Sequence, residues 1–169
     1  LIVLQADAPE GQVFSKWNDG KADNPRIVTA ADASQLFPLF LPKTGQGAVC
    51  VKLPVLAGAG MGAVNVNAAA VTEGESVQLK LVVLPSYSQS SVKVFANGKE
   101  LDATLSLRAS SETKTLFYTL SGLSEDVDVE VSGLKQNEYV VSLEQQDGGI
   151  VRASQVGMVK HGTIVTICL

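Results

Sequence analysis

The feature that most constrains the fold is a series of short alternating apolar and polar runs, each bounded by turn residues. In the middle of the chain these runs recur roughly every 10–15 residues, as in antiparallel sheet proteins. Asn97-Gly98, between two such runs, is a strong hairpin signal. The pattern predicts an all-β fold with an immunoglobulin-like sandwich over residues 46–137. The expected strands of this sandwich are Ala48 to Pro54, Val77 to Leu84, Val92 to Phe95, Thr115 to Leu120 and Val127 to Val131.

Composition favours strands and argues against several classes of function. Hydrophobic residues make up 46% of the 169 residues and aromatic residues only 5%, and the abundant Val and Thr favour strands. The net charge is −4 without any basic run, so nucleic-acid binding is not expected. The most apolar window, Ala48 to Val71, is interrupted by Lys52 and Pro54, so no membrane insertion is expected.

Residues 1–41 hold the only tryptophan and a dense series of turn signals. Pro38 suggests that the last strand of this segment lies at a sheet edge. The expected strands are residues 1–4, Val13 to Trp17, Arg26 to Ala30 and Leu36 to Leu41. A spaced motif runs through them and consists of Pro9, Gly11, Phe14, Trp17, Gly20, Asn24 and Pro25.

This motif resembles the second half of the divergent internalin B-type repeats of bacterial cell-surface proteins, which are small β-grasp-like units. The first half of the same pattern resembles three runs near the other end, Tyr139 to Leu143, Gly148 to Val151 and His161 to Ile167. The expected organisation is therefore a half unit at 1–41, a linker at 42–45, the sandwich at 46–137 and another half unit at 138–169.

Two interpretations of the half units stay open. The chain opens on an apolar run without Met, so it is expected to be a piece of a longer protein whose other half units are missing. Alternatively, residues 139–169 complete residues 1–41, either within one molecule or between copies, because open strand edges are templates for pairing. Head-to-tail completion between copies predicts self-association into chains.

The resemblance implies a non-enzymatic, extracellular structural or spacer module that supports adhesion. Its expected partners are neighbouring domains of the parent surface protein, and no cofactor is expected. A glycan- or host-protein-binding module is the alternative, and an accessory domain of a secreted hydrolase is a second one. Phe14 and Trp17 would stack on a sugar if they faced solvent, but the resemblance implies that both are core residues.

Two acidic clusters are candidate Ca²⁺ ligands, because this ion prefers several hard oxygens together. Asp126, Asp128 and Glu130 alternate along one expected strand, which places their carboxylates on one face. The favoured interpretation is the solvated face of a strand whose valines pack inward. The second cluster is a loop with Asn18, Asp19, Asp23 and Asn24, where these residue types also favour turns.

Four further motifs receive mainly structural interpretations. His161 is the only histidine, so a catalytic triad or a zinc site has too few partners. Gly58 to Gly62 resembles a phosphate-binding loop, but no helical pattern follows it. Leu41-Pro42-Lys43-Thr44-Gly45 matches a sortase motif and is interpreted as a linker. Cys50 and Cys168 are expected to be small buried apolar residues, with a disulfide between them as the alternative.

Overall fold

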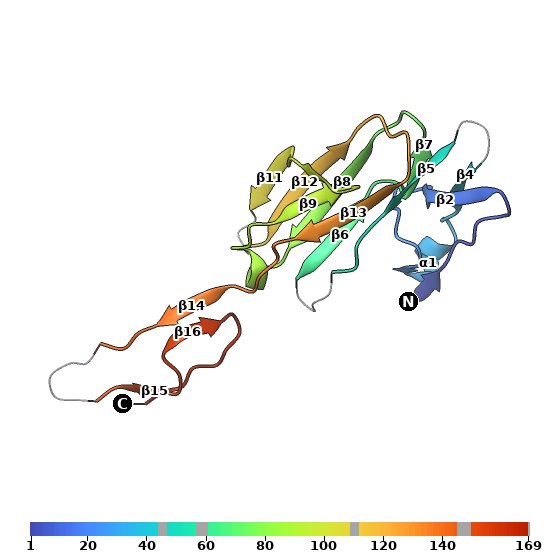
Figure 1. Ribbon diagram of the computed structural model, residues 1–169. Coiled ribbons are helices and arrows are strands. Elements are labelled where there is room, and N and C mark those ends of the chain that lie inside the picture. Colours follow the sequence, from blue (N-terminus) through green and yellow to red (C-terminus); the bar gives the residue numbers. More distant parts are fainter. Residues whose placement is uncertain (44–46, 57–60, 109–111, 145–149, 169) are drawn as a thin grey trace.

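A computed structural model describes residues 1–43, 47–56, 61–108, 112–144 and 150–168 (Figure 1). Within these residues the protein is all-β, as the alternating runs predicted. Three units follow one another along an elongated molecule: the N-terminal unit (β1 to β4 with α1), the sandwich (β5 to β13) and the C-terminal unit (β14 to β17). Figure 1 places the N-terminal and C-terminal units at opposite ends of the sandwich.

The elements have the following bounds. The N-terminal unit contains β1 (Ile2–Leu4), β2 (Gln12–Trp17), β3 (Arg26–Val28), α1 (Ala30–Ala33) and β4 (Pro38–Pro42). The sandwich contains β5 (Ala48–Lys52), β6 (Gly62–Val66), β7 (Ala70–Thr72), β8 (Val77–Val83), a 3-10 turn (Pro85–Tyr87), β9 (Lys93–Ala96), β10 (Lys99–Leu101), β11 (Leu105–Arg108), β12 (Lys114–Leu120) and β13 (Val127–Ser132). The C-terminal unit contains β14 (Glu138–Val141), β15 (Arg152–Ala153), β16 (Gly157–Lys160) and β17 (Ile167–Cys168).

The sandwich consists of two sheets that share one core. One sheet has the strand order β10-β9-β13-β5-β7, and the other has the order β11-β12-β8-β6. Alternate residues of β8 and β12 point inward, as the period of two requires, and they meet valines from β5, β9 and β13. The most deeply buried side chains of this core are Val77, Leu79, Leu81, Val83 and Val94.

The segment that holds β6 and β7 crosses from one sheet to the other. β6 pairs with β8 in the four-stranded sheet, and β7 then pairs with β5 in the five-stranded sheet. Gly62 opens β6 with a φ of 144°, and a Cβ there would overlap the Val82 carbonyl oxygen. Only glycine therefore allows β6 to approach β8 so closely.

The first and last strands of the sandwich lie side by side in parallel. Val127 and Asp128 of β13 are in register with Val51 and Lys52 of β5. The Cys50 N–H donates to the Asp126 carboxylate at 2.8 Å just before the pair. The two ends of the sandwich sequence are therefore joined to one another.

The N-terminal unit packs directly against the edge of the sandwich. Ser15 lies at a bulge where the register of β2 and β4 shifts. Its backbone carbonyl accepts from the Ala69 N–H at 2.8 Å, and its hydroxyl donates to the Ala70 carbonyl at 2.6 Å. Because this contact covers the edge of β7, the sheet edge there is not open.

Trp17 organises the interior of the N-terminal unit. Its side chain is only 3% exposed, and its indole N–H donates to the Asp23 carbonyl at 2.8 Å. Phe14 meets it edge to face with a centroid separation of 5.7 Å. The Asn24 side chain exchanges two hydrogen bonds with the Ala6 backbone. The expectation that Trp17 is a core residue is confirmed.

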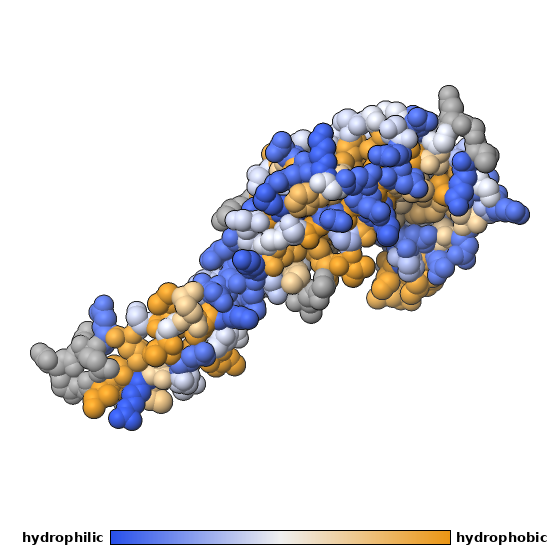
Figure 2. Space-filling model, viewed as in Figure 1, coloured by the Kyte–Doolittle hydropathy of each residue, from blue (hydrophilic) through white to orange (hydrophobic). Residues whose placement is uncertain are grey.

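The C-terminal unit has little interior of its own. It consists of the two-stranded pairs β14-β16 and β15-β17, and among its described residues only Val159 is a buried hydrophobic. Figure 2 shows apolar side chains across its surface. Its largest exposed hydrophobic residues are Tyr139, Val140, Ile150, Val156, Met158, Ile164 and Ile167.

The sequence predictions hold best where the signal is local. The Asn97-Gly98 hairpin is confirmed, because both residues have positive φ between β9 and β10. The strand expected at Arg26 to Ala30 ends earlier, at Val28, because Thr29 caps α1. Within the described residues no helix has the length and apolar character needed to span a membrane.

Candidate functional site

The joint between the sandwich and the C-terminal unit is built around Asn137, whose side chain is 3% exposed. Its amide nitrogen donates to the Pro85 carbonyl at 2.7 Å, and its amide oxygen accepts from the Gln89 N–H at 3.1 Å. Its backbone N–H donates to the Ser86 carbonyl at 2.7 Å. One buried amide therefore fixes the loop 85–90 to the strand that leaves the sandwich.

The same residue anchors the C-terminal unit. The His161 N–H donates to the Asn137 carbonyl at 2.8 Å, and the Gln136 side chain donates to the His161 carbonyl at 3.0 Å. The Tyr139 hydroxyl lies 3.3 Å from both the Asn137 amide nitrogen and the His161 Nδ1. We call this set, residues 85–90, 135–139 and His161, the junction.

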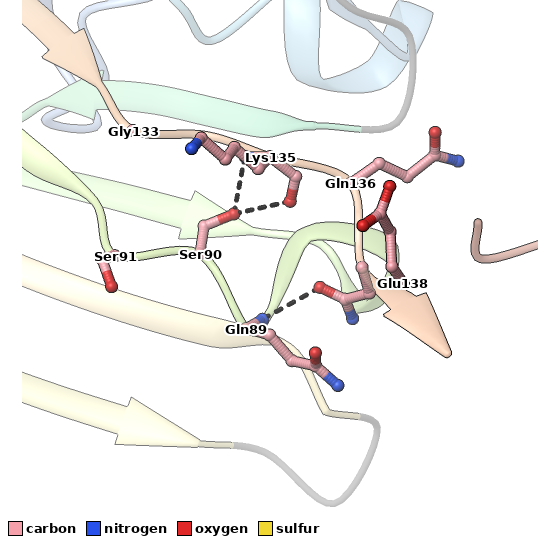
Figure 3. A pocket seen from close by; sticks show the side chains of 8 residues that line it. Gln89, Ser90, Ser91, Gly133, Lys135, Gln136 and Glu138 are labelled. Atoms are coloured by element: carbon pink, nitrogen blue, oxygen red, sulfur yellow. Dashed lines mark hydrogen bonds between the residues drawn. The ribbon is translucent and has the colours of Figure 1, made fainter. Parts of the chain in front are cut away.

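A polar cavity of about 410 Å³ opens beside the junction (Figure 3). The Ser90 hydroxyl donates to the Lys135 carbonyl and accepts from the Lys135 N–H, both at 2.8 Å. Figure 3 shows Gln136 and Glu138 on one wall and Gln89 on the other. The residues that line the cavity are Gln89, Ser90, Ser91, Gly133, Lys135, Gln136, Asn137 and Glu138.

The chemistry of this cavity is hydrogen bonding. Its described lining contains neither His nor Cys, and the Ser90 hydroxyl is already engaged by the backbone groups of Lys135. His161 is half-buried at a turn and contacts Tyr139, with ring centroids 5.9 Å apart. The junction can therefore hold two units in one orientation.

The first acidic cluster does not converge on one point. Asp126 precedes β13 and accepts from the Cys50 N–H, whereas Asp128 forms an exposed ion pair with Lys52 at 3.4 Å. Glu130 is exposed further along β13. Among the described residues no group of three or more His, Cys, Asp or Glu is arranged to hold a metal ion.

The loop with Asn18, Asp19, Asp23 and Asn24 is used within the N-terminal unit. Asp19 accepts two hydrogen bonds from Arg26, at 2.9 and 3.0 Å. These bonds lower the pKa of the Asp19 carboxyl and raise the pKa of Arg26. Asn18 bonds to Gln35 and to the Phe37 N–H. The side-chain oxygens of Asn18, Asp19 and Asn24 therefore accept hydrogen bonds from residues of the N-terminal unit.

Two motifs lie partly outside the described residues. Thr44 and Gly45 of the sortase-like motif are outside them, whereas Leu41 and Pro42 belong to β4. Gly58 to Gly60 of the glycine-rich run are also outside. Gly62 opens a strand, so no helix begins at Gly62 as one would at the end of a phosphate-binding loop.

The expectation for the cysteines needs correction. Cys50 and Cys168 are both free thiols, and Cys168 is exposed on β17 rather than buried. Cys50 is half-buried on β5, and burial raises the pKa of its thiol. Cys50 lies in the sandwich and Cys168 in the C-terminal unit, and no disulfide joins them.

Sequence reasoning missed the junction. Asn137 forms hydrogen bonds with residues 48 to 52 positions away. No short-range sequence pattern predicts such contacts. One available signal was the polar run Lys135-Gln136-Asn137 shortly after β13, which ends at Ser132. No family model, curated protein or solved structure matches this chain, so its function has to be argued from its own residues.

Proposed function

We propose that this chain is a non-enzymatic structural module that spaces neighbouring domains of an extracellular, multidomain bacterial surface protein. The observation that carries the proposal is the end-to-end order of three β units with the chain ends far apart (Figure 1). A spacer needs this geometry, because its neighbours attach at opposite ends.

Both joints of the array are hydrogen-bonded rather than loose. Ser15 joins the N-terminal unit to β7, and Asn137 joins the sandwich to the C-terminal unit. Arrays of small units gain length and stiffness from such contacts between neighbours. The resemblance of Pro9 to Pro25 to internalin B-type repeats, and of the sandwich to immunoglobulin-like modules, supports a surface location.

The proposal includes pairing of the terminal units between two molecules, but it does not include pairing of the two units within one molecule. Completion within one molecule would require the two ends to meet, and Figure 1 places them apart. The exposed apolar residues of the C-terminal unit favour a covering partner, either a neighbouring domain of the parent protein or a second copy.

A distance measurement tests the spacer. Spin labels at Cys168 and at Ile27→Cys, in a Cys50→Ser background, report the separation of the two ends; Ile27 is 68% exposed. A single narrow distance distribution supports a rigid spacer. A label pair at Gln78→Cys and Glu130→Cys, with Cys50 and Cys168 both changed to Ser, gives the width for one rigid unit. A distribution several times broader than this reference contradicts the proposal.

A further inference from the structure

The outward face of the four-stranded sheet carries an aromatic ring beside amide side chains. The neighbours of Lys80 on β8 and of Phe117 on β12 lie in the core, so these two residues point outward. Lys80 is opposite both Asn65 and Phe117 in the register. Its ammonium nitrogen lies 6.0 Å from the centre of the Phe117 ring. The three residues form one row across three strands.

A hollow of about 200 Å³ lies over this row. Among the described residues the side-chain amides of Asn65 and Gln78 have no hydrogen-bond partner, and Asn67 uses only its oxygen, which accepts from the Gln78 N–H at 2.8 Å. Such amides offer both donors and acceptors. The residues that line the hollow are Asn65, Val66, Asn67, Gln78, Leu79, Lys80 and Phe117.

The apolar surface continues beyond the hollow to the edge strand. Leu105 of β11 is opposite Phe117 and is 50% exposed. Leu107 follows two positions later on the same face and is 49% exposed. Lys80 is the one charged residue in the described lining of the hollow. The surface is therefore partly apolar and carries one cation, the Lys80 ammonium beside the Phe117 ring.

We propose that this face binds a neutral glycan. A pyranose ring has an apolar face of C–H groups, which suits the negative face of an aromatic ring. Its hydroxyl rim suits the amides of Asn65, Asn67 and Gln78. Pockets for drug-sized ligands measure about 300–1,000 Å³, so the smaller hollow accommodates one sugar ring. Further sugar rings of the glycan lie over Leu105.

This inference goes beyond the structural role and does not depend on it. A spacer with a glycan site would attach to a surface along its length as well as through its neighbours. The junction cavity is larger, but the described residues that line it include no aromatic ring on which a sugar can stack. The hollow at Phe117 is therefore the better-suited site for a sugar.

Nuclear magnetic resonance titration of the whole chain tests the proposal, with cellohexaose, mannohexaose and xylohexaose as probes. At least one of them is expected to shift the amide signals of Asn65, Gln78 and Phe117 saturably, with a dissociation constant of order 1 mM or lower. Phe117→Ala is expected to weaken this binding at least about tenfold. Phe95→Ala is the matched control, because Phe95 lies on the outward face of the other sheet, next to the core residue Val94.

A second variant keeps the test independent of folding. Gln78 is exposed, so Gln78→Ala is expected to leave the melting temperature unchanged and to weaken binding several-fold. Absence of saturable shifts with all three hexaoses overturns the proposal. Equal losses in Phe95→Ala and Phe117→Ala also overturn it, as do shifts confined to the junction cavity.

Discussion

The Asn137 amide nitrogen lies 2.7 Å from the Pro85 carbonyl oxygen, although 52 positions separate the two residues. Asn137→Ala removes this bond and the bond from the Gln89 N–H to the Asn137 amide oxygen. We expect the free energy of unfolding to fall by about 1–3 kcal/mol, measured by urea denaturation. Glu138→Ala, at the exposed neighbouring position, should change it by less than about 0.5 kcal/mol. Equal effects of the two variants would show that the Asn137 network is not stabilising.

The Asp19–Arg26 pair should make the N-terminal unit acid-sensitive. The hydrogen bonds from Arg26 lower the pKa of Asp19 below its ordinary value of 3.8. The pair therefore contributes stability above this value and loses it as the pH falls through the lowered pKa. Arg26 lies 5.8 Å from the Trp17 ring centre, so Trp17 fluorescence in urea at several pH values reports the change.

The matched variants for this experiment are Asp19→Asn and Glu10→Gln, the latter at an exposed turn position. Asp19→Asn should be less stable than the wild type at pH 7, and this difference should shrink below about pH 4. Glu10→Gln should follow the wild type throughout. A pH-independent difference for Asp19→Asn would contradict the electrostatic explanation.

The two cysteines should react at different rates. Cys168 is exposed, whereas Cys50 is half-buried and has a thiol pKa raised by burial. Because the thiolate is the reactive form, iodoacetamide at pH 8 should label Cys168 at least about tenfold faster. Mass spectrometry of peptides taken over time measures both rates. In guanidinium chloride the two labelling rates should converge. A difference that persists there would show that the local sequence, and not burial in the fold, causes the difference in rate.

The exposed apolar residues of the C-terminal unit should cause association at high concentration. Val140 is 71% exposed and is opposite Met158, which is 58% exposed. Val140→Lys should reduce the mean mass measured by light scattering behind a sizing column, because it breaks this apolar surface. Val55→Lys is the control, since Val55 is 94% exposed outside this cluster. Equal effects of the two lysines would show that added charge alone reduces association.

The parts of the fold that local chemistry decides could be predicted from the sequence. The hairpin at Asn97-Gly98 follows from two residues that accept positive φ, and β8 and β13 follow from strict alternation. Trp17 could be placed in a core because large aromatics bury most of their surface.

The parts that depend on distant partners could not be predicted. β6 and β7 were missed because their alanines and small residues give no alternation, and their position depends on β8 and β5. The junction depends on a buried amide whose partners lie far away in sequence. The hollow at Phe117 appears only when β6, β8 and β12 are side by side, since its residues come from all three strands.

The parallel pairing of β5 and β13 has a mechanical consequence. A force that pulls the chain ends apart drags the start of β5 and the end of β13 in opposite directions along their shared axis. The hydrogen bonds around Val51 and Val127, together with the Lys52–Asp128 ion pair, then bear the load simultaneously in shear. Single-molecule stretching should therefore give a higher rupture force from the two ends than from attachment points on β9 and β10, where a hairpin would open one bond at a time.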